Sequence, residues 1–421
     1  MPHTTSHPSR PAPVSAPDPG LQRRELWLLI TLAGVQFTHI LDFMIMMPLG
    51  PQFTRLFGIS DAQFGLLVSA YTLAAGASGL LASTYIDRFG RKRLLLVLYS
   101  LFGLATLACG LAPTYGSLMV ARVLAGFFGG VLSAMSQTIV ADVVPFERRG
   151  QAMGIVMTSF SLSTVAGVPL GLLLAQWGSW HTPFFAIAAM VGILAVVAAR
   201  TMPTLSAHVH AASGRSAIQG ILQVLADANH RWAFVFTALL MFTGFTVIPY
   251  ITIYLQTNAG VRAEQIPLVY LCGGVTTLFT ARLFGRLTDR YGKVQTFRAL
   301  ALGAAPCLLG ITLVAGHPLW VVLIVSTLMF AIVSGRMIPG MAIVASAAQP
   351  QLRGTFMTLN ASVQSASMGV ASVVGGLVIS RDAQGLVQGY WMCAVLGIAG
   401  SLLSMLAVAQ LHMHGGPARQ R

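Results

Sequence analysis

The stretch STYIDRFGRK, residues 83–92, returns in altered form as GRLTDRYGK, residues 285–293. Both contain Asp, Arg, an aromatic residue and Gly in the same order, followed by basic residues, at an offset of 202 positions. A second pair of segments matches further along each half, because RGQAM at 149–153 corresponds to RGTFM at 353–357. The order and the nearly equal offsets of these matches indicate a chain built from two related halves.

Long apolar segments flank each of these charged stretches. Of 421 residues, 55% are hydrophobic and only 9% are charged, whereas soluble domains carry about 25% charged residues. A helix that crosses the ~30 Å hydrocarbon core needs roughly 20 apolar residues. We therefore predict an all-α integral membrane protein with twelve transmembrane helices in two pseudo-symmetric six-helix bundles. The predicted spans are 26–50, 60–83, 94–112, 115–141, 150–177, 181–199, 232–257, 264–286, 294–315, 319–348, 352–380 and 386–411.

The basic residues indicate how the chain crosses the membrane. Nineteen of the 25 Lys and Arg residues lie in the tails and in the loops and span ends of one side, whereas three lie in loops of the other side. The positive-inside rule then places both termini in the cytoplasm. The formal charge of +14 does not indicate a nucleic-acid partner, because the cations are dispersed over short loops instead of forming one face.

A long internal connection divides the chain. Residues 1–25, with six prolines in the first twenty, are expected to form a disordered cytoplasmic tail. We expect one bundle over 26–200, a cytoplasmic linker over 201–231, a second bundle over 232–411 and a tail over 412–421. Within the linker, an i, i+3, i+4, i+7 apolar stripe that starts at Ile218 predicts a short amphipathic helix at the interface. The alternative is a partly ordered linker with a chance stripe.

Four segments together resemble one transporter family. The 83–92 loop is similar to the signature of the major facilitator superfamily, and the similarity extends over essentially the whole chain after residue 25. ARVLAGFFGG at 121–130, VAGVPLG at 165–171 and LDFMIMMPLGP at 41–51 resemble motifs of its twelve-span drug:proton antiporter branch. Ser83 stands where the family loop usually begins with Gly. The G-V-P-L-G form, with Gly167, Pro169 and Gly171, resembles sugar-efflux and chloramphenicol-type exporters more closely.

This resemblance implies a proton-coupled antiporter for efflux of small organic molecules, either drugs, as in multidrug resistance, or sugars. Parallel six-helix repeats place a substrate site between the halves near the bilayer midplane, and transport then follows alternating access. The implied setting is the bacterial cytoplasmic (inner) membrane, where the protein works as a monomer. We expect no cofactor, no metal site and no nucleic-acid partner.

The two repeated loops are predicted to form a conformational latch. Asp87 can accept from the amides of a neighbouring helix N-terminus or pair with an arginine, and the basic residues can bind helix carbonyls. Such contacts hold while the cytoplasmic side is closed and break when the halves rock. The alternative is that these charges only determine topology. The predicted latch residues are Asp87, Arg88, Gly90, Arg91, Lys92, Arg282, Asp289, Arg290 and Lys293.

Asp42 is the only acid well inside a predicted span, and no other charge lies between Glu25 and Arg55. An ionisable group in hydrocarbon is costly, so it usually has a function. Asp42 and Arg122 are each eight residues from the outer end of their spans, at a depth of about 12 Å. A buried carboxylate holds its proton more readily, and a nearby guanidinium favours its release. We predict proton coupling by Asp42, Arg122 and His39; the alternative is a static buried ion pair that fixes helix packing.

Arg336 lies near the middle of the tenth predicted span, close to Pro339 and Gly340. A cation at a kinked helix suits an anionic or polyhydroxyl substrate, or it donates to carbonyls freed by Pro339. No acid corresponds to Asp42 in the second half, where the aligned residue is Thr243. The candidate substrate-binding residues, which alternatively join helices, are Gln36, Arg336, Tyr250, Tyr254, Asn360 and Gln364.

Two other functions remain compatible with the sequence. A proton symporter that imports a small organic acid would use Arg336 as the carboxylate ligand. A membrane receptor or assembly factor of the same fold would not transport at all. An enzyme is disfavoured, because no span or loop assembles a nucleophile with its base or a cluster of metal ligands.

Overall fold

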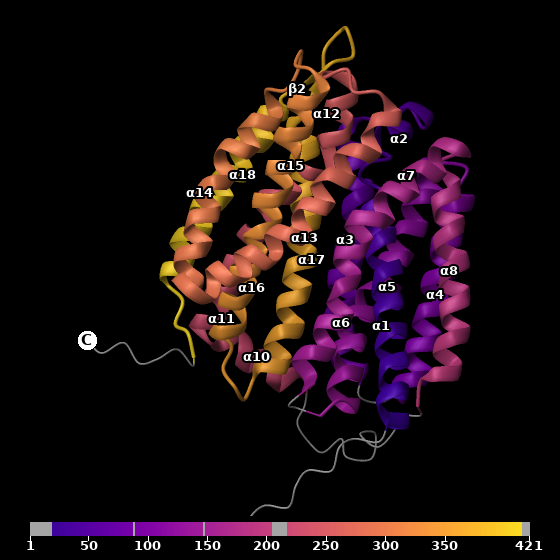
Figure 1. Ribbon diagram of the computed structural model, residues 1–421, viewed down its shortest axis with the longest axis vertical. Helices are drawn as coiled ribbons and strands as arrows, with labels where there is room; N and C mark the ends of the chain where they lie inside the picture. The colour runs from indigo at the N-terminus through magenta and orange to yellow at the C-terminus, as the bar shows by residue number, and fades with distance from the viewer. Residues whose placement is uncertain (1–18, 87–88, 146–147, 204–216, 415–421) are drawn as a thin grey trace, which may run out of the picture.

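The computed structural model describes residues 19–86, 89–145, 148–203 and 217–414. Those residues contain twelve helical spans that are long and apolar enough to cross a membrane, and each overlaps one of the predicted spans. Figure 1 shows two helical bundles side by side, the first in indigo to magenta and the second in orange to yellow. The fold class predicted from the sequence is confirmed.

The first bundle is formed by helices of residues 19–201. In chain order they are α1 (Pro19–Ile45), α2 (Gly50–Leu56), α3 (Asp61–Tyr85), α4 (Arg91–Leu111), α5 (Tyr115–Val143), α6 (Arg149–Leu162), a π-helical turn η3 (Ser163–Gly167), α7 (Val168–Trp177) and α8 (His181–Thr201).

The second bundle follows a linker helix, α10 (Ala217–Ala226). Its elements are α11 (Ala228–Phe245), the 3₁₀ turn η4 (Ile248–Tyr250), α12 (Ile251–Thr257), the 3₁₀ turn η5 (Ala263–Gln265), α13 (Ile266–Tyr291), α14 (Lys293–Thr312), α15 (Leu319–Gly335), α16 (Met337–Ala347), α17 (Arg353–Val378), the strands β1 (Ser380–Arg381) and β2 (Val387–Gln388), and α18 (Tyr390–Ala409).

We call the end of the molecule where α1 begins and α18 finishes the terminal end, which lies at the bottom of Figure 1. The opposite end holds α2, α12 and the β-hairpin. Exposed tryptophans lie near both ends of the spans: Trp27 and Trp232 near the terminal end, and Trp177, Trp320 and Trp391 at the opposite end. Such aromatic belts are typical of the two membrane interfaces.

Local chemistry explains where several helices start. Ser60 accepts from the backbone N–H of Gln63 and completes a capping box at the start of α3. Thr114 and Ser117 form the same arrangement at the start of α5. These caps fix the ends of two helices that later contribute to the candidate site.

The first predicted span, 26–50, is too long by several residues. The helix α1 ends at Ile45, and the chain turns before α2 begins at Gly50. Pro48 cannot donate a backbone hydrogen bond and Pro51 lies in the first turn of α2, as prolines commonly do. Apolar composition alone therefore extended the predicted span through the turn that follows α1.

A β-hairpin separates the last two spans. The apolar runs predicted that the eleventh span ends at 380 and that the twelfth begins at 386. Its strands pair Ser380 with Gln388 in antiparallel register. Asp382 accepts from the amides of Gln384 and Leu386 and from the Gln388 side chain. The Gln388 bond is the main cause that lowers the pKa of the Asp382 carboxyl, and the backbone amides lower it further. Polar side chains and glycine thus turn the chain here in place of helix continuation.

The bundles meet along α3 and α17, which lie side by side over most of their length. Glycines permit this close approach: a Cβ at Gly76 would lie 3.0 Å from the Ser362 carbonyl oxygen, and one at Gly79 would lie 2.9 Å from the Ser362 hydroxyl. On the other side, α13 packs against η3 and α7 but makes few contacts with α6. The helices of this second contact therefore separate toward the terminal end.

The linker helix α10 packs on α11 and α17 of the second bundle and touches α3 of the first. Val224 is fully buried, while Ile218, Leu222 and Leu225 are exposed. Three of the four residues of the predicted stripe thus face outward, whereas the fourth, Ile221, is partly buried and lies with Val224 on the inner face of α10.

Candidate functional site

Asp42 and Arg122 are in direct contact inside the first bundle. The Arg122 Nη1 donates to Asp42 Oδ2 at 2.8 Å and to the Asp42 backbone oxygen at 3.1 Å. Both side chains are 0% exposed. The sequence placed the two residues at the same depth on α1 and α5, and the structure shows that they meet.

The contact leaves several polar atoms without hydrogen bonds. Asp42 Oδ1 and the Nε and Nη2 of Arg122 have no partner, although all are buried. Thr106 on α4 lies beside the same carboxylate, close enough for its hydroxyl to interact with it. Buried polar groups are normally satisfied, so each such group in a native protein requires an explanation. A cluster of them is the arrangement expected where a proton, water or ligand is accommodated.

Aromatic rings and His39 surround this pair. The Arg122 guanidinium lies over the ring of Tyr71, 4.4 Å from its centroid, which is a favourable cation–π arrangement. Both ring nitrogens of His39 are buried and unpaired, and its ring lies 6.0 Å from Tyr71 and 6.1 Å from Phe102, measured between centroids. We call Asp42, Arg122, His39, Tyr71 and Thr106 the polar cluster.

The polar cluster lies within the first bundle, not between the two halves. Its members come from α1, α3, α4 and α5, and α5 packs against each of the other three helices. The close approach of α5 to α3 depends on small residues, because a Cβ at Gly126 would overlap the Tyr71 backbone and one at Gly130 would lie 2.6 Å from the Ala75 Cα. The GFFGG segment therefore holds Arg122, one turn away, over Tyr71 and against Asp42.

The helix-five motif packs on the helix that carries Asp42. Gly167, the last residue of η3, lies opposite Leu41, and Gly171 of α7 lies opposite Ile45. Pro169 is in the first turn of α7, directly after η3. These three residues thus bring the wide turn η3 against α1, one residue away from the acid.

The candidate substrate residues differ in their surroundings. Gln36 donates to Ser133 Oγ at 3.0 Å, and its Oε1 is unpaired. Tyr250 donates to the Ser372 carbonyl and Tyr254 to the Thr312 carbonyl. Asn360 accepts from Thr237 at 2.7 Å. The hydroxyls of the two tyrosines therefore join helices of the second bundle, whereas Gln36 keeps an unused acceptor; Gln364 is half-buried.

Arg336 occupies a break between α15 and α16 and is 1% exposed. Its Nε donates to the Val333 carbonyl at 3.2 Å and its Nη2 to the Leu240 carbonyl at 2.8 Å, whereas Nη1 is unpaired. Pro339 has no N–H to donate to the Gly335 carbonyl, four residues earlier. Arg336 does not donate to that carbonyl in its place. Arg336 thus joins α15 to α11 and keeps one buried donor group free.

The predicted latch residues are only partly described, since Asp87 and Arg88 lie outside the described residues. Gly90 is the N-cap of α4. Arg91, 4% exposed, donates to Asp142 Oδ2 at 3.2 Å and to the Ile86 carbonyl at 3.0 Å. Lys92 donates to the Met202 carbonyl at 2.7 Å. These bonds connect helix ends within the first bundle.

The counterparts in the second bundle are more exposed. Lys293 donates to Ser346 Oγ at 2.5 Å. Arg290 lies over the Tyr291 ring, and Arg282 and Asp289 are exposed. The bond of Lys293 also lies within one bundle.

Among the described residues, the hydrogen bonds that join the two bundles all lie at the opposite end. Arg381 of the hairpin donates to both carboxylate oxygens of Asp61, at 2.9 and 2.8 Å. Gln176 donates to the Ala263 carbonyl at 2.8 Å, and Arg55 to Gln256 Oε1 at 3.3 Å. We call these three contacts the opposite-end clamp.

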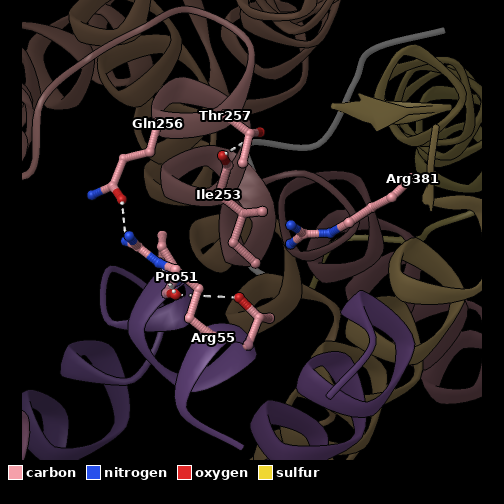
Figure 2. Close-up of a pocket in the computed structure, with 7 residues that line it drawn as sticks. Pro51, Arg55, Ile253, Gln256, Thr257 and Arg381 are labelled. Atoms are coloured by element: carbon pink, nitrogen blue, oxygen red, sulfur yellow. Dashed lines mark hydrogen bonds between the residues drawn. The ribbon is translucent and has the colours of Figure 1, made fainter. Parts of the chain in front are cut away.

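A pocket of about 170 Å³ lies beside the clamp. Figure 2 shows Arg55 of α2 reaching toward Gln256, and Arg381 extending toward Ile253 from the other side. The pocket is lined by boundary residues of both bundles and contains neither Asp42 nor Arg336. It is therefore separate from the polar cluster.

Sequence reasoning missed several members of these sites. Tyr71 and Thr106 gave no signal, because one tyrosine or threonine in a span is unexceptional. The Asp61–Arg381 pair had a weak signal, since Arg381 is one of only three basic residues in the loops of its side.

Comparison with known proteins agrees with this architecture. The family model of the Major Facilitator Superfamily matches residues 32–372 and 233–417. The uncharacterised MFS-type transporter YtbD of Bacillus subtilis strain 168 is 25% identical over 344 residues, 81% of this chain and 85% of that protein. A second uncharacterised MFS-type transporter of the same organism, YbcL, is 24% identical over 385 residues, 91% of this chain and 95% of its own length.

Solved structures show the same fold at lower identity. A D-xylose–proton symporter has a TM-score of 0.73 and 18% identity, over 90% of this chain and 96% of its own. A bacterial homologue of the human lysosomal transporter Spinster, in an inward-facing and unoccupied conformation, has a TM-score of 0.69 and 15% identity, over 92% and 97%. The chain therefore belongs to the major facilitator superfamily. It is a multi-pass membrane transporter with twelve spans.

Proposed function

We propose that this protein is a secondary active transporter that exports small organic molecules from the bacterial cytoplasm in exchange for protons, as the drug:proton antiporter branch does. The observation that carries the proposal is the polar cluster: a fully buried carboxylate in contact with a single arginine, surrounded by polar atoms that have no hydrogen-bond partner. A packing role alone would be better served by a pair whose remaining donors and acceptors are satisfied.

Asp42 is the proton carrier in this proposal, and Arg122 sets its affinity for the proton. Arg122 contacts the side chain and the backbone oxygen of the same residue. When Asp42 takes up a proton, its charge is lost and the side-chain bond weakens, while the backbone bond still holds Arg122 on α1. His39, one turn before Asp42, has two unpaired nitrogens through which a proton can reach or leave the carboxylate.

Movement of the bundles couples this protonation to substrate export. The opposite-end clamp joins the two bundles. The protein is therefore closed at that end in this conformation. With both termini in the cytoplasm, as the positive-inside rule predicts, that end is the outer one and substrate would bind from inside. Outward release then requires the clamp to break and the latch loops at the terminal end to close.

The test uses inside-out membrane vesicles energised by respiration, with an acridine dye reporting the proton gradient. Candidate drugs and sugars are added one at a time to vesicles that contain the wild type, Asp42→Asn or Asp42→Glu. We expect a substrate to release protons from the vesicles and restore dye fluorescence with the wild type. The signal should be lost with Asp42→Asn and partly kept with Asp42→Glu, because only the latter retains a titratable group.

A matched control is Glu264→Gln, which makes the same chemical change at an exposed residue of η5, at the very start of a span. This variant should respond like the wild type. Substrate-dependent proton flux that is equal in Asp42→Asn and wild type would contradict the assignment of Asp42. Absence of flux for every compound, with folded protein, would instead favour the reading of a non-transporting receptor.

A further inference from the structure

The buried guanidinium of Arg336 is the strongest unexplained feature of the second bundle. The residue lies between α15 and α16, inside the tenth span, and is 1% exposed. Two of its three nitrogens donate to carbonyls, and Nη1 donates to nothing. A full positive charge with an unused donor is therefore enclosed within the membrane-spanning part of the protein.

No acid in the described part of the chain neutralises this charge. The sequence after residue 216 contains four carboxylates, and these are Asp227, Glu264, Asp289 and Asp382. The first caps α11, the second lies in η5, the third lies near the end of α13 and the fourth lies in the hairpin. All are near the membrane boundaries, and Arg336 makes no ion pair with any described residue.

Comparison of the two bundles shows what is missing. In the first bundle, an arginine of the fourth span donates to a backbone oxygen of the first span, Asp42, and also to its carboxylate. In the second bundle, an arginine of the fourth span donates to a backbone oxygen of the first span, Leu240. Both contacts join an arginine of a fourth span to a carbonyl of a first span, but Leu240 lies three residues before Thr243, the residue that aligns with Asp42. Thr243 bonds to the Leu239 carbonyl, so no carboxylate accompanies the contact of the second bundle.

We propose that an anionic group of the transported molecule takes the place of this carboxylate, so that the substrate is an organic anion bound by Arg336. This inference rests on the proposed transport function and specifies its substrate class. A charged group inside the membrane normally pairs or marks a substrate path, and here none of the described residues provides a carboxylate partner. Nη1 is the only free nitrogen of Arg336, so it suits a singly charged carboxylate or sulfonate bound through one side of the guanidinium.

The experiment measures binding to the purified full-length protein in detergent, without a proton gradient. The melting temperature is recorded with pairs of aromatic acids and neutral isosteres, beginning with 1-naphthoate, 1-naphthalenesulfonate and 1-naphthamide. Sodium chloride is titrated separately in the same low-salt buffer. We expect the acids to raise the melting temperature of the wild type and the amides to leave it unchanged.

Three variants test whether Arg336 causes that shift of the melting temperature. Arg336→Gln should lose the stabilisation by acids, and Arg336→Lys should keep it with an apparent affinity reduced roughly tenfold or more, since a lysine retains the charge but not the fixed donor geometry. Arg298→Gln removes an exposed arginine of α14 and should behave like the wild type. If Arg336→Gln does not fold, the reduced affinity of Arg336→Lys carries the test.

Equal shifts with acids and amides, or equal shifts in wild type and Arg336→Gln, would overturn the inference. A chloride titration that reproduces the full shift would also overturn it, because the occupant would then be an inorganic ion. Proton flux driven only by neutral or cationic compounds would refute the anion site and leave proton-coupled transport intact. Anion binding without proton flux would support the anion site and refute proton-coupled transport.

Discussion

At the scale of single residues, the contact between Asp42 and Arg122 depends on a residue that touches neither side chain. Arg122 is held over Tyr71 because α5 lies close to α3, and this approach is possible only while Gly126 has no Cβ. A small residue one turn away therefore controls the geometry of the pair.

Gly126→Ala should separate α5 from α3, because its Cβ would overlap the Tyr71 backbone. Overpacking of this kind costs about 1–3 kcal/mol, so we expect a lower melting temperature and weaker substrate-dependent proton flux in vesicles. Gly116→Ala is the matched control on the same helix, where a Cβ would meet nothing within 4 Å. Its stability should be unchanged or slightly higher, since alanine favours helices. Equal flux in the two variants would contradict the role of this packing.

The sequence identified Asp42 and Arg122 because charges inside apolar spans are rare. Their depths could be counted from the span ends, since a helix has a constant rise per residue. The direction of each side chain around its helix could not be obtained in this way. Tyr71, Thr106 and the unpaired atoms of His39 therefore became apparent only once four helices had been placed together.

At the scale of elements, the opposite-end clamp joins segments that lie between the spans. Asp61 starts α3, and Arg381 belongs to the hairpin before α18. Asp61 is almost fully buried while Arg381 is about one third exposed. The hydrogen bonds to Asp61 raise the pKa of Arg381 above its ordinary value, so the guanidinium stays charged across the physiological range.

Asp61→Asn should shift the protein toward the state that is open at the clamp end. A partly exposed ion pair contributes about 1 kcal/mol, which corresponds to a roughly fivefold change in the ratio of two states. Spin labels at Leu56 and Glu264, which line one pocket between the bundles, would report a larger population of long distances by double electron–electron resonance. Arg381→Gln should give the same shift. An unchanged distance distribution in both variants would show that the clamp does not influence the equilibrium.

The ends of the helices could be predicted from the sequence where they depend only on the length of the apolar run. The break after Ile45 and the π-helical turn η3 were not predicted, since they lie in apolar segments and depend on local hydrogen bonding. The β-hairpin was not predicted either, because its polar residues indicate the end of a span but not the pairing of two short strands. In η3 the turn is wider by one residue, which barely alters the pattern of hydrophobic residues. The repeat of two loops, in contrast, gave the two-bundle organisation directly.

At the scale of the whole molecule, the proposed charges determine how transport responds to the membrane potential. Export of a singly charged anion in exchange for one inward proton transfers two positive charges inward. Each charge contributes about 2.3 kcal/mol per 100 mV, so a negative interior drives this exchange strongly. Import of the same anion together with one proton transfers no net charge.

We therefore expect 1-naphthoate, if it is bound as proposed, to accumulate faster in inside-out vesicles when the lumen is made positive by valinomycin and an inward potassium gradient. Vesicles with Asp42→Asn should show a smaller response, because the coupled proton is lost. Accumulation that follows the pH difference but ignores the potential would contradict antiport. It would favour proton symport of an organic acid, the alternative that the sequence left open.

The glycine-lined contact between α3 and α17 has a consequence for how this protein tolerates variation. Backbone meets backbone there at Gly76 on one helix and at Gly376 on the other, where an added Cβ would lie 3.0 Å from the Ser362 oxygen and 2.9 Å from the Ala62 Cα, respectively. At these two positions the facing backbone cannot move aside as a side chain could when bulk is added. The two helices can pivot about one another, whereas sliding would bring each glycine against a neighbour that does not fit. In a saturation mutagenesis screen, we expect larger residues to be tolerated poorly along this contact and well on the lipid-facing surfaces of the protein.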